Sequence, residues 1–176
     1  VEVVLSPPGA KESAMQGQAG YSTEDFGSFT VGAITTGSSV AGAYTATGGN
    51  TAIGNSTNPI FGGNFVGVNS GNSMTFTLPQ PSRYVGMFAM WISNGSTYEF
   101  LDTNDNVVAS LNSSSLMSLL NSGAVASDGQ TYTLSQYIAS LQSEPSVYIN
   151  LRLNDPSITF SKIRLSASGG TGNEFD

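Results

Sequence analysis

The chain has 176 residues and a net charge of −7, and it contains neither cysteine nor histidine. Its length suffices for one domain with its own core, while the missing residues exclude thiolate nucleophiles, Cys-based zinc sites and Ser-His-Asp mechanisms. The five basic residues form no dense run that could follow phosphates, which argues against nucleic acid as a partner. Because only 10% of the residues are charged, we expect a surface of hydroxyls and amides, as in extracellular proteins.

The hydropathy of the chain argues against a membrane protein. No apolar stretch approaches the roughly 18 residues that a spanning helix needs, so we expect no membrane insertion of this chain. The sequence starts at Val1 without the basic and then apolar residues of a signal peptide, which is typical of a mature, processed chain. We therefore expect an extracellular or cell-surface location.

The first predicted strand covers residues 1–5, and a polar, Pro-containing loop follows it to residue 23. We accordingly divide the chain into residues 1–23, an N-terminal strand with a flexible loop, and residues 24–176, a β-sandwich domain. A free apolar strand at a terminus is a liability unless something pairs with it. Two interpretations stay open: the strand folds back as an edge strand of its own domain, or it completes the sheet of a neighbouring subunit as a donor strand through Val1, Val3, Val4 and Leu5.

The remainder of the chain consists mainly of short runs with apolar residues at every second position, separated by Gly, Asn, Ser and Pro. This pattern predicts antiparallel strands with one buried face. We expect an all-β fold, a single antiparallel β-sandwich of jelly-roll type with two short helical insertions. The predicted strands after the first are residues 26–34, 39–45, 61–68, 73–78, 84–91, 96–101, 107–111, 147–153 and 158–165.

Two stretches break the alternation and predict the helices. The first contains leucines of one helical face at 116, 119 and 120; a serine run before them supplies a candidate N-cap, and Gly123 a candidate C-cap. In the second, Thr133 and Gln136 form a T-x-x-Q capping box. The apolar residues that follow are spaced three and four apart, as one helical face requires: Leu134, Tyr137, Ile138 and Leu141.

Asp102, Asn104 and Asn106 place oxygen-bearing side chains at alternate positions, as at the start of a calcium loop. The rest of the EF-hand pattern is missing, because Val107 stands where glycine is needed and Ser113 where glutamate is needed. A hairpin turn explains the same residues, since Asp and Asn bond their own backbone in turns. We favour the turn and keep calcium as the alternative, with no other cofactor expected.

Trp91 is the only tryptophan and could stack against a sugar ring. An aromatic residue in a central strand is more often part of the core, so we favour that role and keep glycan binding as the alternative. Two carboxylate pairs, Glu99 with Asp102 and Glu24 with Asp25, could be proposed for glycoside hydrolysis. Nothing in the sequence supplies the cleft that such a pair needs, so we expect no catalysis.

From about residue 61 onward, the order of features resembles exported bacterial proteins that carry a PEP-C-terminal (exosortase) sorting signal. The sorting signal itself is not part of this sequence, and the resemblance covers about two thirds of the chain. It implies export and a β-sandwich associated with extracellular polysaccharide, biofilm or surface layers, and it implies no catalytic residues. The segments that carry it are Gly62-Gly63-Asn64-Phe65, residues 74–79, 86–91 and 98–106, Tyr148-Ile149-Asn150-Leu151, Ile163-Arg164-Leu165 and Glu174-Phe175-Asp176.

Taken together, these observations lead us to expect a non-catalytic extracellular structural protein of a bacterial surface, matrix or filament. The expected partners are further copies of the chain, joined by the N-terminal strand, and extracellular polysaccharide. The alternative is a carbohydrate-binding module, assisted by calcium. An exposed aromatic row on one sheet face, or a metal in the 102–106 turn, would favour that alternative.

Overall fold

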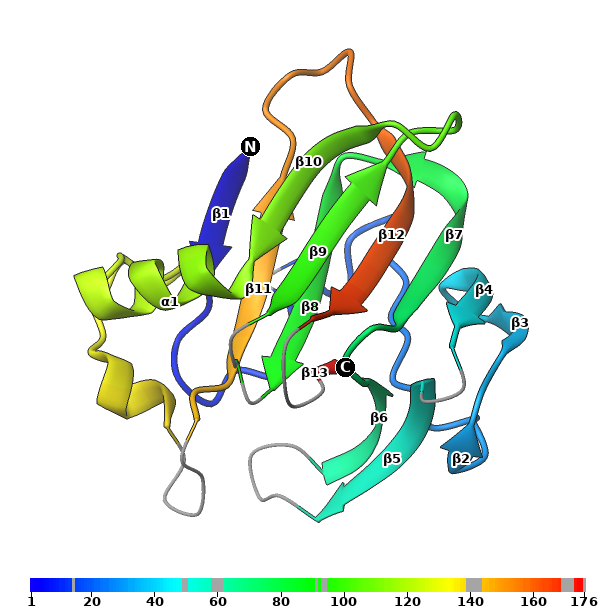
Figure 1. The fold of residues 1–176 in the computed structure, drawn as a ribbon. Helices are drawn as coiled ribbons and strands as arrows, with labels where there is room; N and C mark the ends of the chain where they lie inside the picture. The colour runs from blue at the N-terminus through cyan, green and yellow to red at the C-terminus, as the bar shows by residue number, and fades with distance from the viewer. Residues whose placement is uncertain are drawn as a thin grey trace.

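The computed structural model of the protein describes residues 1–13, 15–48, 51–57, 62–90, 92, 95–138, 144–168 and 173–175 (Figure 1). Most of these residues are in short strands, with one α-helix, α1 (Ser113–Ser122), and one 3-10 helix, η1 (Leu134–Tyr137). The strands are β1 (Glu2–Leu5), β2 (Gly32–Ala33), β3 (Thr36–Ser39), β4 (Gly42–Thr47), β5 (Thr51–Thr57), β6 (Gly62–Val68), β7 (Ser73–Ser82), β8 (Tyr84–Met90), β9 (Ser96–Leu101), β10 (Val107–Asn112), β11 (Val147–Arg152), β12 (Phe160–Ala167) and β13 (Asn173–Phe175).

The described strands form two sheets in which neighbours pair antiparallel. Sheet A has the order β1-β11-β8-β13-β6-β5-β2, and sheet B has the order β10-β9-β12-β7-β4-β3. Eight consecutive strands, β6 to β13, are distributed between the sheets as β6-β13-β8-β11 and β7-β12-β9-β10, which is the strand order of a jelly roll. The predicted antiparallel, jelly-roll-like all-β fold is therefore confirmed. The remaining strands extend the sheets at their edges: β1 beyond β11, β5 and β2 beyond β6, and β4 and β3 beyond β7.

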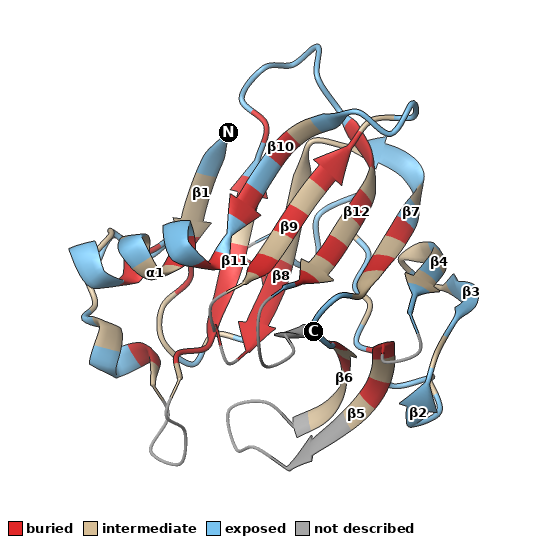
Figure 2. Cartoon of the chain, in the orientation of Figure 1, coloured by how far each residue is buried: buried red, intermediate tan, exposed pale blue. Residues whose placement is uncertain are grey.

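The main core lies between the two sheets and takes side chains from both. Alternation along each strand decides which residues enter it. In β9, Tyr98 and Phe100 are buried, whereas Thr97 and Glu99 face outward, and Figure 2 shows the same alternation along the neighbouring strand β12. The rings of Phe100 and Phe160 meet edge to face with their centroids 5.3 Å apart, which joins β9 to β12.

A second, smaller cluster contains Phe88, Met90 and Tyr148, with Phe65 packed against it. Phe88 and Met90 alternate in β8 with Met87 and Ala89, which belong to the main core. The second cluster therefore lies on the opposite face of sheet A. Burial on both faces explains why the last four residues of β8 are all buried.

The first helical prediction is confirmed in α1, and the second is corrected. The side chain of Asn112, rather than a serine, caps α1 at its N-terminus by accepting from the Ser115 N–H at 2.8 Å. Gly123 ends α1 in the left-handed conformation, at φ 69°, as glycine at a C-cap commonly does. The second helix is a single 3-10 turn, because Ile138 already adopts an extended conformation, and the predicted Leu141 lies outside the described residues.

Candidate functional site

The N-terminal strand β1 lies at the edge of sheet A and pairs with β11 of the same chain. The register runs from Glu2 opposite Arg152 to Leu5 opposite Ile149. Leu5 is 2% exposed in the main core and Val3 packs against that core, whereas Val1 is 60% exposed. Within one chain, β1 thus folds back as an edge strand of its own domain, as the first of the two interpretations predicts. Its donation to a second chain stays a prediction.

The outer edge of β1 is covered at its C-terminal end. The Ser6 N–H donates to the Tyr148 carbonyl at 2.9 Å, so by alternation the main-chain groups of Val4 also point toward β11. The groups of Val3 and Leu5 point the other way, and the Leu5 carbonyl accepts from the Ser127 N–H at 2.9 Å. The loop after α1 thus occupies the C-terminal end of this edge.

A polar cluster holds the chain where β1 ends; we call its members Ser6, Tyr137 and Asn150 the Ser6 cluster. Ser6 is 2% exposed. Its hydroxyl accepts from the Asn150 side-chain amide at 2.9 Å, and its carbonyl accepts from the Tyr137 hydroxyl at 3.1 Å. The same Asn150 amide donates to the Val4 carbonyl at 3.2 Å. Each polar group of this buried serine therefore has a partner, as burial of a polar residue requires.

The elements around the Ser6 cluster keep its side chains in place. The Tyr84 hydroxyl on β8 donates to Asn150 Oδ1 at 2.8 Å and contacts the Ser13 hydroxyl, which ties the N-terminal loop to sheet A. Partial burial raises the pKa of Tyr84, so this hydroxyl stays protonated and able to donate at neutral pH. A Cβ on Gly86, the residue opposite Asn150, would collide with the hydroxyls of Tyr148 and Tyr84, so only glycine leaves room for both rings.

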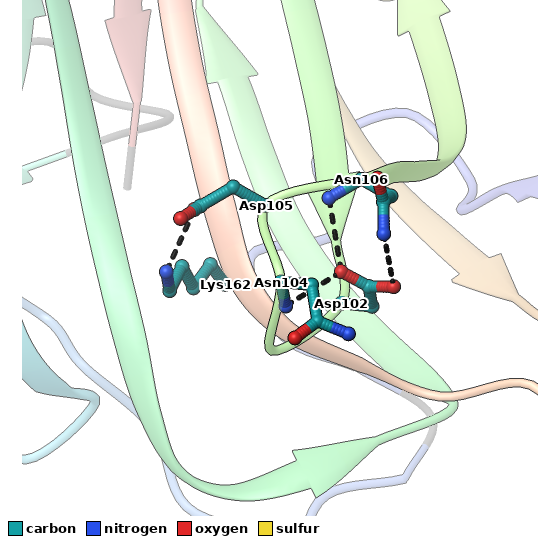
Figure 3. Close-up of polar contacts among 5 residues, drawn as sticks. All are labelled: Asp102, Asn104, Asp105, Asn106 and Lys162. Atoms are coloured by element: carbon teal, nitrogen blue, oxygen red, sulfur yellow. Dashed lines mark hydrogen bonds and ion pairs between the residues drawn. The ribbon is translucent and has the colours of Figure 1, made fainter.

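The predicted calcium residues lie in the turn between β9 and β10 (Figure 3). One oxygen of Asp102 accepts from the main-chain N–H groups of Asn104 and Asn106 at 2.8 and 2.9 Å, and the other accepts from the Asn106 side-chain amide at 2.9 Å. Asp105, at φ 65°, forms an ion pair with Lys162 at 2.7 Å. The turn interpretation is confirmed. Calcium binding stays a prediction, and it would require the Asn106 amide nitrogen to turn away from Asp102.

Hydrogen-bonded carboxylates in this turn and elsewhere predict that the folded protein loses stability in acid. The hydrogen bond from the Asn106 side chain is the first cause that lowers the pKa of Asp102 below 3.8, and hydroxyl donors likewise lower the pKa values of Asp128 and Asp155. The folded state favours these charged carboxylates, so their stabilisation is complete above 3.8 and is lost as the pH falls through the lower folded values. The urea concentration at the unfolding midpoint, measured from neutral pH to about pH 2, should therefore decrease as the pH falls below 3.8.

The variant Asp102→Asn isolates the contribution of that one carboxylate. It retains an oxygen that can accept from the main-chain N–H groups but does not titrate. The decline of its urea midpoint on acidification should therefore be shallower than in the wild type. An equally steep decline would show that the Asp102 hydrogen bonds contribute nothing to the acid sensitivity.

The other sequence candidates are distributed over the fold. Trp91 lies outside the described residues. Glu99 forms an ion pair with Arg164 at 2.7 Å on the outer face of sheet B. Both oxygens of Glu24 accept main-chain N–H groups, from Phe26 at 2.8 Å and from Val40 at 3.0 Å. The carboxylates of Glu99 and Glu24 are thus both engaged in contacts within the protein.

The Ser6 cluster was missed in the sequence. Its one visible signal is Asn150, a polar residue inside the otherwise apolar run 147–151. Ser6 and Tyr137 give no signal, since a serine before Pro7 is typical of a loop and a tyrosine on a short helix is an ordinary core residue. Their meeting depends on contacts between residues more than a hundred positions apart.

The fold and the contacts define this chain as a jelly roll with an added N-terminal edge strand. Comparison with protein-family models, with curated proteins and with solved structures finds no match. Within the described part of the chain, no helix has the length and apolar character needed to cross a membrane.

Proposed function

We propose that the protein is a non-catalytic structural component of a bacterial surface, extracellular matrix or filament, and that its copies join by exchange of β1. The observation that carries this proposal is the way β1 is attached. In its own sheet it has one neighbouring strand, β11, yet it contributes the buried Leu5 to the core. A copy of β1 from a second chain could occupy the same place and make the same contacts.

The segment after β1 supports the exchange. Residues 6–31 separate β1 from β2 and include Pro7 and Pro8, which stiffen the chain in an extended form. After Leu5, the next apolar residue buried in the core is Phe26. Between them the chain makes polar contacts such as that of the Ser13 hydroxyl with Tyr84. This length of chain gives β1 the reach to enter a neighbouring molecule, while the jelly roll stays closed behind it.

The outer face of sheet B supports a place in a hydrated matrix. Its side chains are mainly hydroxyls and amides, and its charges include the Arg164–Glu99 ion pair. Across β4, β7, β12, β9 and β10 the register aligns two rows, Thr45, Thr75, Arg164, Glu99 and Ser110 in one and Thr47, Ser73, Ser166, Thr97 and Asn112 in the other. Such a face can hydrogen-bond water and polysaccharide hydroxyls.

The resemblance to exported PEP-C-terminal proteins also supports the proposal. The segments that carry it lie mostly in the strands of the jelly roll, from β6 through β13. The features shared with that group are thus features of the domain body. Strand β1, which we infer to be the joining element, precedes them.

The experiment is a disulfide test between two variants of the full chain, made possible because the natural chain has no cysteine. Val3 lies opposite Leu151. Because Ser6 and Val4 direct their main-chain groups toward β11, Val3 and Leu151 form a non-hydrogen-bonded pair. The Cα atoms of such a pair are about 4.5 Å apart, which is within the range of a disulfide. Val3→Cys mixed with Leu151→Cys under oxidising conditions should form a covalent heterodimer on a non-reducing gel.

Two controls make the result decisive. Val4→Cys mixed with Leu151→Cys should form little heterodimer, because the Val4 side chain is on the opposite face of β1. The double variant Val3→Cys/Leu151→Cys reports whether the pair can close at all. If it closes within single chains while the mixture yields no heterodimer, the copies do not exchange β1 and the proposed assembly is wrong.

A further inference from the structure

We propose that the Ser6 cluster selects the strand that occupies the edge beside β11, by accepting only a strand with a hydroxyl residue directly after its buried leucine. Applied to a strand from a second copy of this chain, the inference rests on the proposed function. Applied to β1 in its own chain, it rests on the contacts alone. The site would thus determine both the register and the partner of the exchanged strand.

Apolar packing alone does not determine this register. The residues of β1 that face the core, Val3 and Leu5, are two positions apart, and the exposed Val1 before the strand has the same parity. The core-facing residues of β11 and its continuation also recur at every second position, at Ile149, Leu151 and Leu153. A slip of two residues therefore keeps apolar side chains against apolar side chains and keeps the same face inward. Another interaction must distinguish the register of the structure from the slipped ones.

The Ser6 cluster supplies that distinction, because its donors are held at fixed positions. The Tyr137 hydroxyl comes from η1, whose start is fixed by the Thr133 N–H donating to the Gln136 side chain at 2.7 Å, and Tyr137 itself is 3% exposed. Asn150 is oriented from the other side by the Tyr84 hydroxyl at 2.8 Å. Both donors are thus also held by contacts outside β1.

A slipped strand would leave the Asn150 amide without its Ser6 partner. Shifting β1 by two residues puts the apolar side chain of Val4 or Pro8 where the Ser6 hydroxyl accepts from Asn150, whereas main-chain carbonyls recur at the same places with this period. Unpaired buried polar groups cost more than the hydrogen bonds themselves contribute. The same argument disfavours a foreign apolar strand that carries a large or apolar residue in place of Ser6, which is 2% exposed. Single polar contacts that specify register in this way are well attested.

The experiment measures the register by disulfide formation in the full chain. Val3→Cys is combined with Ile149→Cys, Leu151→Cys or Leu153→Cys, once within one chain and once as a mixture of two single variants. In the natural background the pair with residue 151 should dominate in both formats. Ser6→Ala should lower the ratio of the 151 product to the other two about tenfold, because it removes the one side-chain hydrogen bond that depends on the register. Tyr137→Phe should leave the ratio unchanged, because a main-chain carbonyl stands at the same place in each register.

Matched hydroxyl removals serve as controls. Ser161→Ala removes a buried serine hydroxyl that has no hydrogen-bond partner among the described residues, and Tyr132→Phe removes an exposed tyrosine hydroxyl that bonds Asp128. Both should leave the product ratio unchanged. A ratio that is equally unchanged in Ser6→Ala would overturn the inference.

The two formats separate this inference from the proposed function. A register shift within single chains, with no product in the mixtures, would support selection by the Ser6 cluster and contradict exchange between copies. Mixed products whose register ignores Ser6 would support exchange and overturn selection. A shift in both formats would support both.

Discussion

Deletion of residues 1–5 should abolish any filaments that the native protein forms and lower the free energy of unfolding of the subunit by about 3 kcal/mol or more. The deletion removes the buried Leu5 side chain, the partly buried Val3 and the main-chain hydrogen bonds to β11. It also removes the element that would enter a neighbouring copy. Negative-stain electron microscopy of native material beside the truncated chain tests the first effect, and urea unfolding tests the second.

The control for the deletion is Val1→Ala. Val1 is 60% exposed and precedes the first paired residue, so this change should leave filaments and stability close to those of the wild type. Filaments that persist in the truncated chain would rule out β1 as the joining element. A full-length protein that stays monomeric under native conditions would remove the filament from the proposal.

Phe100→Ala should lower the free energy of unfolding by about 3–5 kcal/mol, because it leaves a cavity at the centre of the core. Phe100 is 0% exposed and packs edge to face against Phe160 on the neighbouring strand β12. The adjacent variant Glu99→Ala should cost less than about 1 kcal/mol, since its partly exposed ion pair with Arg164 is screened by solvent. Urea unfolding of both variants measures the difference.

The comparison between these two neighbours tests the alternation of β9. If Phe100→Ala and Glu99→Ala destabilise the protein to similar extents, the two side chains do not lie on opposite faces of a sheet. If both are nearly neutral, the core between sheets A and B is not the main source of stability.

Most of the jelly-roll strands were predictable because their apolar alternation is strong. The runs that became β7, β8, β9, β10, β11 and β12 were all predicted, with ends that differ by a few residues. Strand β5 was missed, because Thr51–Thr57 contains Gly54 and Asn55 and little apolar side chain. It is a strand because it pairs with β6 along seven positions, a contact that no local pattern reveals.

The predicted strand at 26–34 is corrected for a similar reason. Its apolar residues suggested one continuous strand, but only Gly32–Ala33 pairs, as β2. Phe26 adopts φ 53°, and the Asn64 amide donates to the carbonyls of Phe26 and Phe29 at 3.0 Å each. The segment is therefore shaped by contacts with β6 and by the packing of its two phenylalanine rings, 5.4 Å apart.

By itself the sequence determined the class of fold, the turn at Asp102 and the cap of α1 at Gly123, because alternation, Asx turns and glycine caps depend on neighbouring residues. Only the tertiary structure decided where β1 pairs, that the end of β8 is buried on both faces of sheet A, and that Ser6 meets Tyr137 and Asn150. The contacts of Ser6 with Tyr137 and Asn150 join residues 131 and 144 positions apart in the sequence. Their free energy arises only when the sheets close and water leaves the site.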